Sequence, residues 1–265
     1  MKLHCRIAGQ GAPLILLHGL LGSLDNWQTP ARRFARHFQV FAVDQRNHGH
    51  SPHGDPISFD AMAADVLEFM DAHGLAGAHL LGHSMGGKTA MQFALRHPER
   101  VRKLVVVDVA PRAYPPHHAP ALAALLALDL RAFHRRDQLD AALAKSIEDP
   151  VVRRFLLKNA ARDAAGAFRW KANLRGLWEN HERLAAAVSG DIPFTKPALF
   201  VRGEKSDCIG EADLELIGRL FPRATVRTIA GAGHWVHADE PEALCETVLK
   251  FLAGTGQSAP AGARE

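Results

Sequence analysis

Cysteine and tyrosine are scarce in this 265-residue chain, which contains three cysteines and one tyrosine. Cys5, Cys208 and Cys245 lie far apart, whereas a secreted disulfide scaffold needs a dense, even set of cysteines. The three also lack the close sequence spacing that is typical of zinc ligands. We therefore expect a protein of a reducing compartment, the cytoplasm, that binds no metal.

Long apolar runs are absent as well. The most apolar stretch, ALAALLAL from Ala121, ends at Asp129 and is too short to span a bilayer. The first residues, MKLHCRIAGQGAP, contain no apolar core or cleavage site of a secretion signal. The formal net charge is +4, but the basic residues are spread out and no nucleic-acid motif accompanies them. We expect a soluble protein without a membrane span or a nucleic-acid partner.

Six apolar runs of strand length recur between helix-like segments, and they cover residues 13–19, 38–44, 78–84, 103–111, 197–203 and 224–233. Such runs, alternating with amphipathic patterns such as FDAMAADVLEFMDAHG, predict parallel strands that helices bury on both faces. The predicted fold class is α/β, with a mostly parallel central sheet flanked by helices. Ligands of such sheets bind beyond the carboxyl ends of the strands, where Ser84 and Asp108 lie.

The interval 113–195 breaks this alternation. It is rich in Ala, Leu and Arg at helical spacing and shows no convincing strand, which predicts a helical cap inserted before the penultimate strand. The core domain would then comprise residues 1–112 and 196–254. The last residues, 255–265, are small, polar and proline-containing, and we predict a disordered tail.

Gly82, Ser84 and Gly86 form a G-x-S-x-G pattern between an apolar run and a helix-like segment. At a strand-to-helix junction this pattern is typical of a nucleophile elbow, a tight turn that strains the serine backbone and exposes the hydroxyl. The following KTAMQFALRH predicts a helix, whose N-terminus carries partial positive charge. We therefore predict that Ser84 is a nucleophile; the alternative is an ordinary glycine-rich turn.

A serine hydroxyl is a poor nucleophile near neutral pH, so it needs a histidine base and a carboxylate that orients the base. The chain has 16 histidines, and His234 stands out among them by position. The segment GAGHWVHADEPEALCETVLKFL places it in a glycine-rich loop after the last predicted strand and before the final amphipathic helix. His237, three residues on, is its rival.

Four segments, in this order along the chain, resemble the α/β-hydrolase superfamily. LLHGLLGSLDNW is similar to its oxyanion loop, DQRNHGHS to the loop after the next strand, GHSMGG to its elbow and GHWVHADEP to its histidine loop. RNHGHS in place of R-G-x-G-x-S, together with FRWKANLRGL in the insertion, resembles a narrower branch of small bacterial esterases and ABHD11-type hydrolases. Asp44, Arg46 and His48 are expected to brace the loops around the site.

The position of the carboxylate that orients the histidine departs from the superfamily's most common pattern. Many relatives carry it three residues after the glycine equivalent to Gly203, where this chain has Ser206, and Asp207 lies one residue later. The resemblance to the small-esterase branch instead implies Asp108, 24 residues after Ser84, with a serine similar to Ser206 assisting the histidine. We favour Asp108 as the acid, with Asp207 as the alternative.

The backbone N–H groups of Leu20 and Met85 are expected to form the oxyanion hole, because the resemblance places Leu20 in the HGLL loop and Met85 directly after the nucleophile. The residues expected in the substrate pocket are His18, Trp170, Leu174, Trp178 and Trp235. Trp170, Leu174 and Trp178 also share a predicted helical face with Leu177, and packing of the cap on the main domain is the other interpretation of that face.

These features predict a serine hydrolase of the carboxylesterase or thioesterase type. It would cleave small-molecule carboxylic esters with short to medium acyl chains through an acyl-enzyme on Ser84, without a cofactor or a metal. Arginines of the cap would also suit the phosphates of acyl coenzyme A thioesters; they are Arg131, Arg135, Arg136, Arg153, Arg154, Arg162, Arg169 and Arg175. The serine disfavours the related dehalogenases and epoxide hydrolases, which use aspartate. Three alternatives stay open: a cofactor-free haloperoxidase, a carbon–carbon bond hydrolase with the same triad, and a non-catalytic ligand-binding protein.

Overall fold

A seven-stranded sheet forms the centre of the computed structural model, which describes residues 1–254. The strands are β1 (Cys5–Ala8), β2 (Pro13–Leu17), β3 (Gln39–Val43), β4 (Ala78–His83), β5 (Val101–Val107), β8 (Ala198–Gly203) and β9 (Ala224–Ile229). Their order is β1-β3-β2-β4-β5-β8-β9, and only β1 runs antiparallel to its neighbour. The predicted α/β class and mostly parallel sheet are confirmed. The predicted tail, 255–265, lies outside the described residues.

Five of the six predicted apolar runs contain one parallel strand of this sheet, and the sixth, 103–111, covers most of β5, which begins two residues earlier at Val101. The seventh strand, β1, was not predicted. Its four residues, CRIA, lie at the sheet edge and are mostly exposed, so they carry no apolar run. Arg6 pairs with Ala42 of β3, and the ladder between β1 and β3 closes this side of the sheet.

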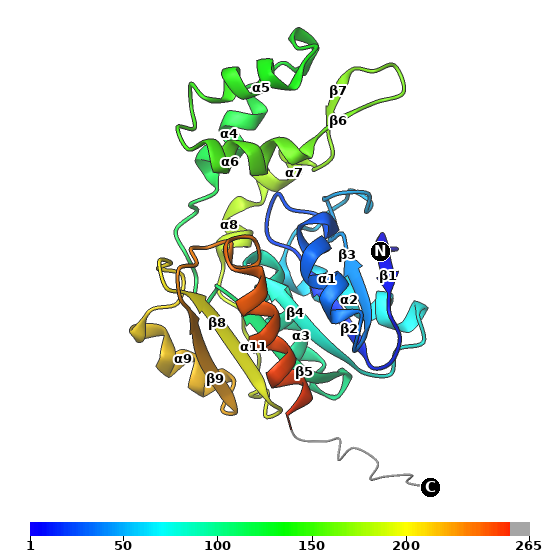
Figure 1. Cartoon of the computed structure of the whole chain (residues 1–265), viewed down its shortest axis with the longest axis vertical. Helices are drawn as coiled ribbons and strands as arrows, with labels where there is room; N and C mark the ends of the chain where they lie inside the picture. Colours follow the sequence, from blue (N-terminus) through cyan, green and yellow to red (C-terminus); the bar gives the residue numbers. More distant parts are fainter. Residues whose placement is uncertain (255–265) are drawn as a thin grey trace, which may run out of the picture.

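Alternate residues of the central strands face opposite sides of the sheet, as the pleat of a strand requires. In β2, Leu14 and Leu16 pack with helices α1 and α11, whereas Ile15 and Leu17 pack with α2, α3 and α9. Figure 1 shows α11 and α1 in front of the sheet and α3 behind it. The bounds are α1 (Gln28–Phe34), α2 (Phe59–Ala72), α3 (Met85–Arg96), α9 (Leu214–Leu220), α10 (Val236–Asp239) and α11 (Pro241–Ala253).

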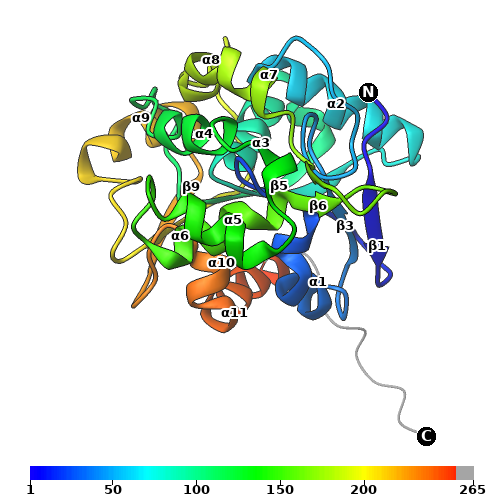
Figure 2. The same ribbon diagram turned by 90° about the horizontal axis from the view of Figure 1, so that it is seen from above.

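The segment between β5 and β8 adds no strand to the central sheet. Its elements are α4 (Ala119–Leu126), α5 (Arg136–Leu143), α6 (Pro150–Leu156), β6 (Ala160–Arg162), β7 (Phe168–Trp170), α7 (Leu174–Glu179) and α8 (His181–Ala185). Figures 1 and 2 show that this inserted segment stands over one edge of the sheet. Its apolar side chains, among them Leu122, Leu125 and Leu177, form a third buried cluster with Leu20 and Met85 of the core domain.

The insertion is not entirely helical, and here the prediction was wrong. Strands β6 and β7 pair as an antiparallel hairpin, in which Ala160 lies opposite Trp170. Each strand has only three residues, so neither could produce a recognisable run in the sequence. Asn173 then starts α7 by accepting a hydrogen bond from Gly176 N, at 3.1 Å. Because the helix begins after Trp170, this residue does not share a helical face with Leu174 and Trp178.

Both ends of the inserted segment are held by one buried lysine. Lys88, on α3, donates hydrogen bonds from Nζ to the carbonyl oxygen of Arg112, directly before the insertion, and to that of Ala186, directly after its last helix, α8. Burial, with the Arg112 charge as a smaller cause, lowers the pKa of Lys88 to about 7. The helix that follows Ser84 therefore carries the anchor of the insertion.

Among the described residues, no helix is long and apolar enough to cross a membrane. The predicted cytoplasmic location stays a prediction.

Candidate active site

Four loops meet at the carboxyl edge of the sheet and bring the predicted polar residues together. Ser84 directly follows β4, Asp108 directly follows β5, Ser206 follows β8 and His234 follows β9. These four strands are neighbours in the sheet, so their carboxyl ends lie side by side. Residues up to 150 positions apart in sequence thereby line one site, as expected at this edge of a parallel sheet.

The turn at Ser84 has the conformation of a nucleophile elbow. Ser84 has φ 51° and ψ −119°, a region that residues with a side chain rarely adopt. The turn is so tight that a Cβ atom on Gly82 would lie 2.1 Å from the carbonyl oxygen of Gly86. A Cβ atom on Gly86 would lie 2.3 Å from the carbonyl oxygen of Leu17. Both glycines of the motif are therefore required by backbone contacts.

Substitution of Gly82 by alanine is expected to lower the free energy of unfolding by about 3 kcal/mol or more, because the methyl group would clash with rigid backbone atoms. Gly218→Ala is the matched control. Gly218 lies in α9 with no atom within 4 Å of an added Cβ, so alanine should raise stability there by about 0.5–1 kcal/mol. Urea unfolding of both variants measures the difference. A Gly82→Ala protein within 1 kcal/mol of the wild type would contradict the proposed tightness of the turn.

Several residues near the carboxyl edge of the sheet have a strained backbone conformation. Within residues 1–254, four non-glycine residues have positive φ: Leu21 at 59°, Asn47 at 65°, Ser84 at 51° and Asp108 at 53°. Strained backbone of this kind costs about 1–3 kcal/mol per residue and tends to occur at functional sites. Ser84 and Asp108 are thus held in fixed directions by the fold, as a preorganised site needs.

Asp108 is the carboxylate that contacts His234. Its Oδ2 lies 2.8 Å from His234 Nδ1 and accepts a hydrogen bond from Ser206 Oγ at 2.5 Å. Its Oδ1 accepts a hydrogen bond from Gly203 N at 2.9 Å. Asp207 is exposed and makes no hydrogen bond with His234. The geometry brings together Ser84, His234, Asp108 and Ser206, and leaves the alternative acid outside.

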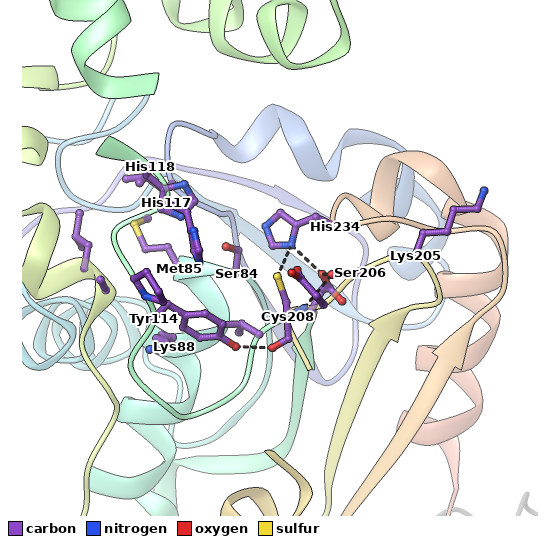
Figure 3. A pocket seen from close by; sticks show the side chains of 17 residues that line it. Ser84, Met85, Lys88, Tyr114, His117, His118, Lys205, Ser206, Cys208 and His234 are labelled. Atoms are coloured by element: carbon purple, nitrogen blue, oxygen red, sulfur yellow. Dashed lines mark hydrogen bonds and ion pairs between the residues drawn. The ribbon is translucent and has the colours of Figure 1, made fainter. Parts of the chain in front are cut away.

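His234 is the imidazole that lies beside Ser84, and Figure 3 shows the two side chains next to each other on the wall of a cavity. No hydrogen bond joins Ser84 Oγ to His234 among the described residues, and such bonds are often long before substrate binds. The rival, His237, is buried, contacts the rings of Trp27 and His83, and has no hydrogen-bond partner for its Nδ1 in the described chain. Its position does not allow an interaction with Asp108.

The environment of His234 favours its protonated form. Burial lowers its pKa, but the hydrogen bonds from Nδ1 to the Asp108 carboxylate and to the sulfur of Cys208 outweigh burial and raise the pKa above the ordinary 6.5. Cys208 Sγ lies 3.4 Å from Nδ1. An Asp108–His234 pair of this kind fixes the imidazole orientation and stabilises the cation that forms when the base takes up a proton.

Other histidines around the site are neutral hydrogen-bonding groups. Burial lowers the pKa of His18 to about 4 and that of His48 to about 3. His48 Nε2 accepts a hydrogen bond from Leu21 N at 3.1 Å, and His18 Nε2 accepts one from Gln45 N at 3.0 Å. His83, whose pKa burial lowers well below 6.5, donates from Nε2 to the carbonyl oxygen of His234 at 2.8 Å. These bonds tie the loops after β2, β3, β4 and β9 to one another.

The segment DQRNHGHS braces the loop after β2, as expected. Asp44 Oδ1 accepts a hydrogen bond from Leu24 N at 2.7 Å, and Arg46 forms a buried ion pair with Asp65. Asn159 of the inserted segment also donates from Nδ2 to the carbonyl oxygen of Leu21, at 2.6 Å. The position of the loop that carries Leu20 is therefore fixed from two sides.

Two backbone donors next to Ser84 have no partner. The N–H groups of Leu20 and Met85 make no hydrogen bond with any residue that the structure describes. Met85 is the first residue of α3, so its N–H is one of the groups that an α-helix leaves unpaired at its N-terminus. Both residues line the cavity that contains Ser84, so their free N–H groups suit a developing negative charge there.

Two cavities meet at Ser84 and His234. The larger has a volume of about 350 Å³ and continues toward Tyr114, Leu184 and Cys208. The smaller has a volume of about 180 Å³ and continues toward Phe155 and Trp235. Residues that line both cavities are Leu20, Ser84, His117, His118 and His234. Sites of this size accommodate small organic molecules.

The predicted pocket residues divide into two groups. His18 and Trp235 line the smaller cavity. Trp170, Leu174 and Trp178 line neither cavity, which corrects their expected placement. Leu174 is buried in the cluster of the inserted segment, and Trp178 stacks on His181 with ring centroids 5.1 Å apart. The alternative interpretation, packing of the cap on the main domain, suits Leu174 and the partly buried Trp170, which share a cluster with Leu20 and Met85, whereas Trp178 is exposed.

Several residues of the cavity wall were not predicted. Tyr114, His117 and His118 belong to the stretch after β5, and Figure 3 shows them across the cavity from His234. Burial lowers the pKa of His118 to about 4, so its ring is neutral. The rule that pointed to Asp108, a position after the carboxyl end of a strand, also applies to PRAYPPHH. Cys208 also follows the carboxyl end of a strand, two residues after Ser206, but the sequence gives no sign that its thiol contacts His234.

Comparison with known proteins places this site in a family. A family model described as alpha/beta hydrolase fold matches residues 12–241, so the chain belongs to the α/β-hydrolase fold family. It is 37% identical over 250 residues to the sn-1-specific diacylglycerol lipase ABHD11 of Xenopus tropicalis, covering 91% of this chain and 78% of that protein. It is 35% identical over 243 residues to esterase YbfF of Escherichia coli, covering 91% and 93%.

A solved structure described as a marine microorganism esterase resembles this one with a TM-score of 0.92 at 42% identity, covering 94% of this chain and 99% of that one. These comparisons confirm the predicted family, its esterase branch and the enzyme class, an ester-cleaving hydrolase. The roles of individual residues remain predictions.

Proposed function

We propose that this protein is a serine esterase that cleaves small carboxylic esters through an acyl-enzyme on Ser84. The observation that carries the proposal is the hydrogen-bonded pair of Asp108 and His234, 2.8 Å apart, beside a serine held on a strained turn. A serine, a histidine and a buried carboxylate in this arrangement are what acyl transfer requires. The esterase and lipase names of the relatives support the same class.

In the proposed mechanism, Ser84 Oγ attacks the acyl carbonyl carbon and His234 takes up the hydroxyl proton. Asp108 keeps Nδ1 of His234 protonated, so that Nε2 is free to act as the base, and it stabilises the resulting cation. Leu20 and Met85 donate their free N–H groups to the tetrahedral oxygen, a contribution of about 3–4 kcal/mol per donor. His234 then returns the proton to the leaving alcohol. In the second half-reaction water attacks the acyl carbonyl carbon while His234 takes its proton, and His234 gives that proton to Ser84 Oγ as the acid leaves.

We further propose short to medium acyl chains, with the inserted segment acting as a cap that shapes the site. The larger cavity suits the acyl chain, because Met85, Val109 and Leu184 offer it an apolar wall. The smaller cavity, beside Trp235, suits the alcohol. The cap boundaries follow from the absence of any central strand between β5 and β8 in the described chain.

Acyl coenzyme A thioesters gain less support as substrates. Five of the eight arginines considered for phosphate binding have local partners: Arg135 with Asp137, Arg136 with Leu157 O, Arg153 with Asp140, Arg162 with His134 O, and Arg175 with Glu179. None of the eight lines either cavity at Ser84. We therefore propose esters as the main substrate class.

The test is hydrolysis of p-nitrophenyl esters from acetate to palmitate, with acyl coenzyme A thioesters alongside, by the wild type and by Ser84→Ala. Turnover by the wild type that Ser84→Ala loses is expected, highest for short and medium chains. Folded wild-type protein that hydrolyses none of these substrates would contradict the proposal.

The acid limb of the pH profile should lie at a higher pH than an ordinary histidine would give. The base must be neutral to act, so activity falls as the pH drops through the pKa of His234, which its surroundings raise above 6.5. We expect the midpoint of the acid limb of kcat/KM above pH 6.5, measured with an ester that does not titrate. The other histidines with shifted pKa values have lowered ones, so a limb at pH 6 or below would contradict the role of His234.

A further inference from the structure

Three side chains that can bind a metal ion, including that of His234, lie close together next to Ser84. His234 Nδ1, Asp108 Oδ2 and Cys208 Sγ all lie within 4.8 Å of one another. Figure 3 shows the sulfur of Cys208 beside the imidazole of His234. The three residues lie far apart in the sequence, because the loops after β5, β8 and β9 supply one residue each.

The proposed mechanism uses the carboxylate and the imidazole but leaves the thiol without a role. Cys208 is held in place by its backbone, since its carbonyl oxygen accepts a hydrogen bond from Tyr114 Oη at 2.5 Å and its N–H donates to Ser206 Oγ at 3.3 Å. The residue is half-buried and lines the larger cavity, as does His234. An ion in that cavity can therefore reach all three atoms.

Two of the three separations between ligand atoms can be compared with those of a zinc site. Zinc bonds of about 2.0–2.3 Å in a tetrahedral arrangement separate neighbouring ligand atoms by roughly 3.3–3.7 Å. Cys208 Sγ and His234 Nδ1 already lie 3.4 Å apart. Asp108 Oδ2 and His234 Nδ1, at 2.8 Å, would have to separate by about 0.5 Å, which the glycine-flanked loop of His234 can accommodate.

The charges also suit a divalent cation. A carboxylate, a thiolate and a neutral imidazole carry two negative charges in total, which one Zn²⁺ ion neutralises. Binding would move the proton of His234 from Nδ1 to Nε2 through water, which leaves the imidazole neutral, and would release the proton of the Cys208 thiol to water. Three protein ligands would leave the fourth position of the ion facing the cavity.

We propose that Asp108, Cys208 and His234 form an inhibitory site for zinc or another thiol-binding divalent cation. An ion bound there replaces the Asp108–His234 hydrogen bond and occupies Nδ1, so the imidazole loses the orientation and the cation stabilisation that a base needs. The inhibitory consequence rests on the proposed function, whereas binding of the ion does not. Release of the ion by a chelator would restore the hydrogen bond and the activity.

Direct binding is tested with Co²⁺ as a spectroscopic substitute for zinc, on protein without an affinity tag. Wild-type protein is expected to show the absorption of a cobalt–thiolate bond at one ion per chain, and Cys208→Ala to lack it. Cys5→Ala is the matched control, because Cys5 Sγ also lies near a histidine, 4.0 Å from His73 Nε2, but belongs to no cluster of three ligands. It should bind cobalt as the wild type does. Wild-type protein without this absorption, or Cys208→Ala with it, would overturn the proposal.

Inhibition is tested by ester hydrolysis in buffered zinc, with each variant's rate compared to its own rate in chelator. The wild type and Cys5→Ala should lose activity and recover it on chelation, and Cys208→Ala should need at least about tenfold more zinc, since it lacks a ligand. Equal zinc sensitivity of Cys208→Ala and the wild type would overturn the inhibitory role. Wild-type protein that is inactive even in chelator would contradict the proposed function instead, and the cobalt spectrum would still decide whether the metal site exists.

Discussion

Ser84→Ala is expected to lower kcat for ester hydrolysis by about 10⁵-fold or more. The substitution removes the only atom that forms the acyl-enzyme in the proposed mechanism, and the triad acts as a unit, so Asp108 and His234 cannot compensate. The oxyanion donors and the cavity stay in place and account for the small residual rate. Initial rates with a short-chain p-nitrophenyl ester, and labelling of Ser84 by a fluorophosphonate probe, measure the loss.

Stability separates this catalytic loss from a folding defect. Alanine keeps a Cβ atom at φ 51°, so Ser84→Ala should unfold at a denaturant concentration close to that of the wild type. Ser84→Gly should be equally inactive and about 1 kcal/mol more stable than Ser84→Ala, because glycine adopts this backbone region without strain. A folded Ser84→Ala protein with more than a few per cent of wild-type activity would contradict the role of the serine.

The sheet could be predicted because each of its parallel strands is covered on both faces. Burial on both sides makes residues such as 13–17 or 104–107 read as apolar runs; five parallel strands lie within the predicted runs, and β5 begins two residues before its run. The short strands could not be recognised in this way. β1 lies at the edge and β6 and β7 have three residues each, so their pairing depends on contacts between chain segments and not on local pattern.

The site could be predicted in part for a similar reason. Ser84, Asp108 and His234 follow the carboxyl ends of strands, and the glycines around Ser84 mark the turn in the sequence itself. Trp170, in contrast, was placed by helical spacing, which fails because the helix begins only after Asn173. The contact of Cys208 with His234 could not be predicted, since it exists only once β8 and β9 are paired.

The second large effect should distinguish the two candidate acids. Asp108→Asn is expected to lower kcat/KM for esters by about 10⁴-fold, because an amide in place of the carboxylate favours the wrong imidazole tautomer and cannot stabilise the His234 cation. Asp207→Asn should stay within about twofold of the wild type, because Asp207 is exposed and makes no hydrogen bond with His234. The two variants change the same chemical group at positions 99 residues apart, so they form a matched pair.

Fold and chemistry can be separated for Asp108 as well. The amide oxygen of asparagine can still accept the hydrogen bond that Asp108 Oδ1 accepts from Gly203 N, at 2.9 Å, so the loop after β8 should keep its place. Ser206→Ala, which removes the hydroxyl donor to Oδ2 and the acceptor of the Cys208 N–H, should cost far less activity than Asp108→Asn, about tenfold. Circular dichroism checks the fold of each variant, and kcat/KM at the pH optimum ranks them. A crippled Asp207→Asn beside a nearly normal Asp108→Asn would overturn the assignment, because the hydrogen bond from His234 to Asp108 would then orient a base that the reaction does not use.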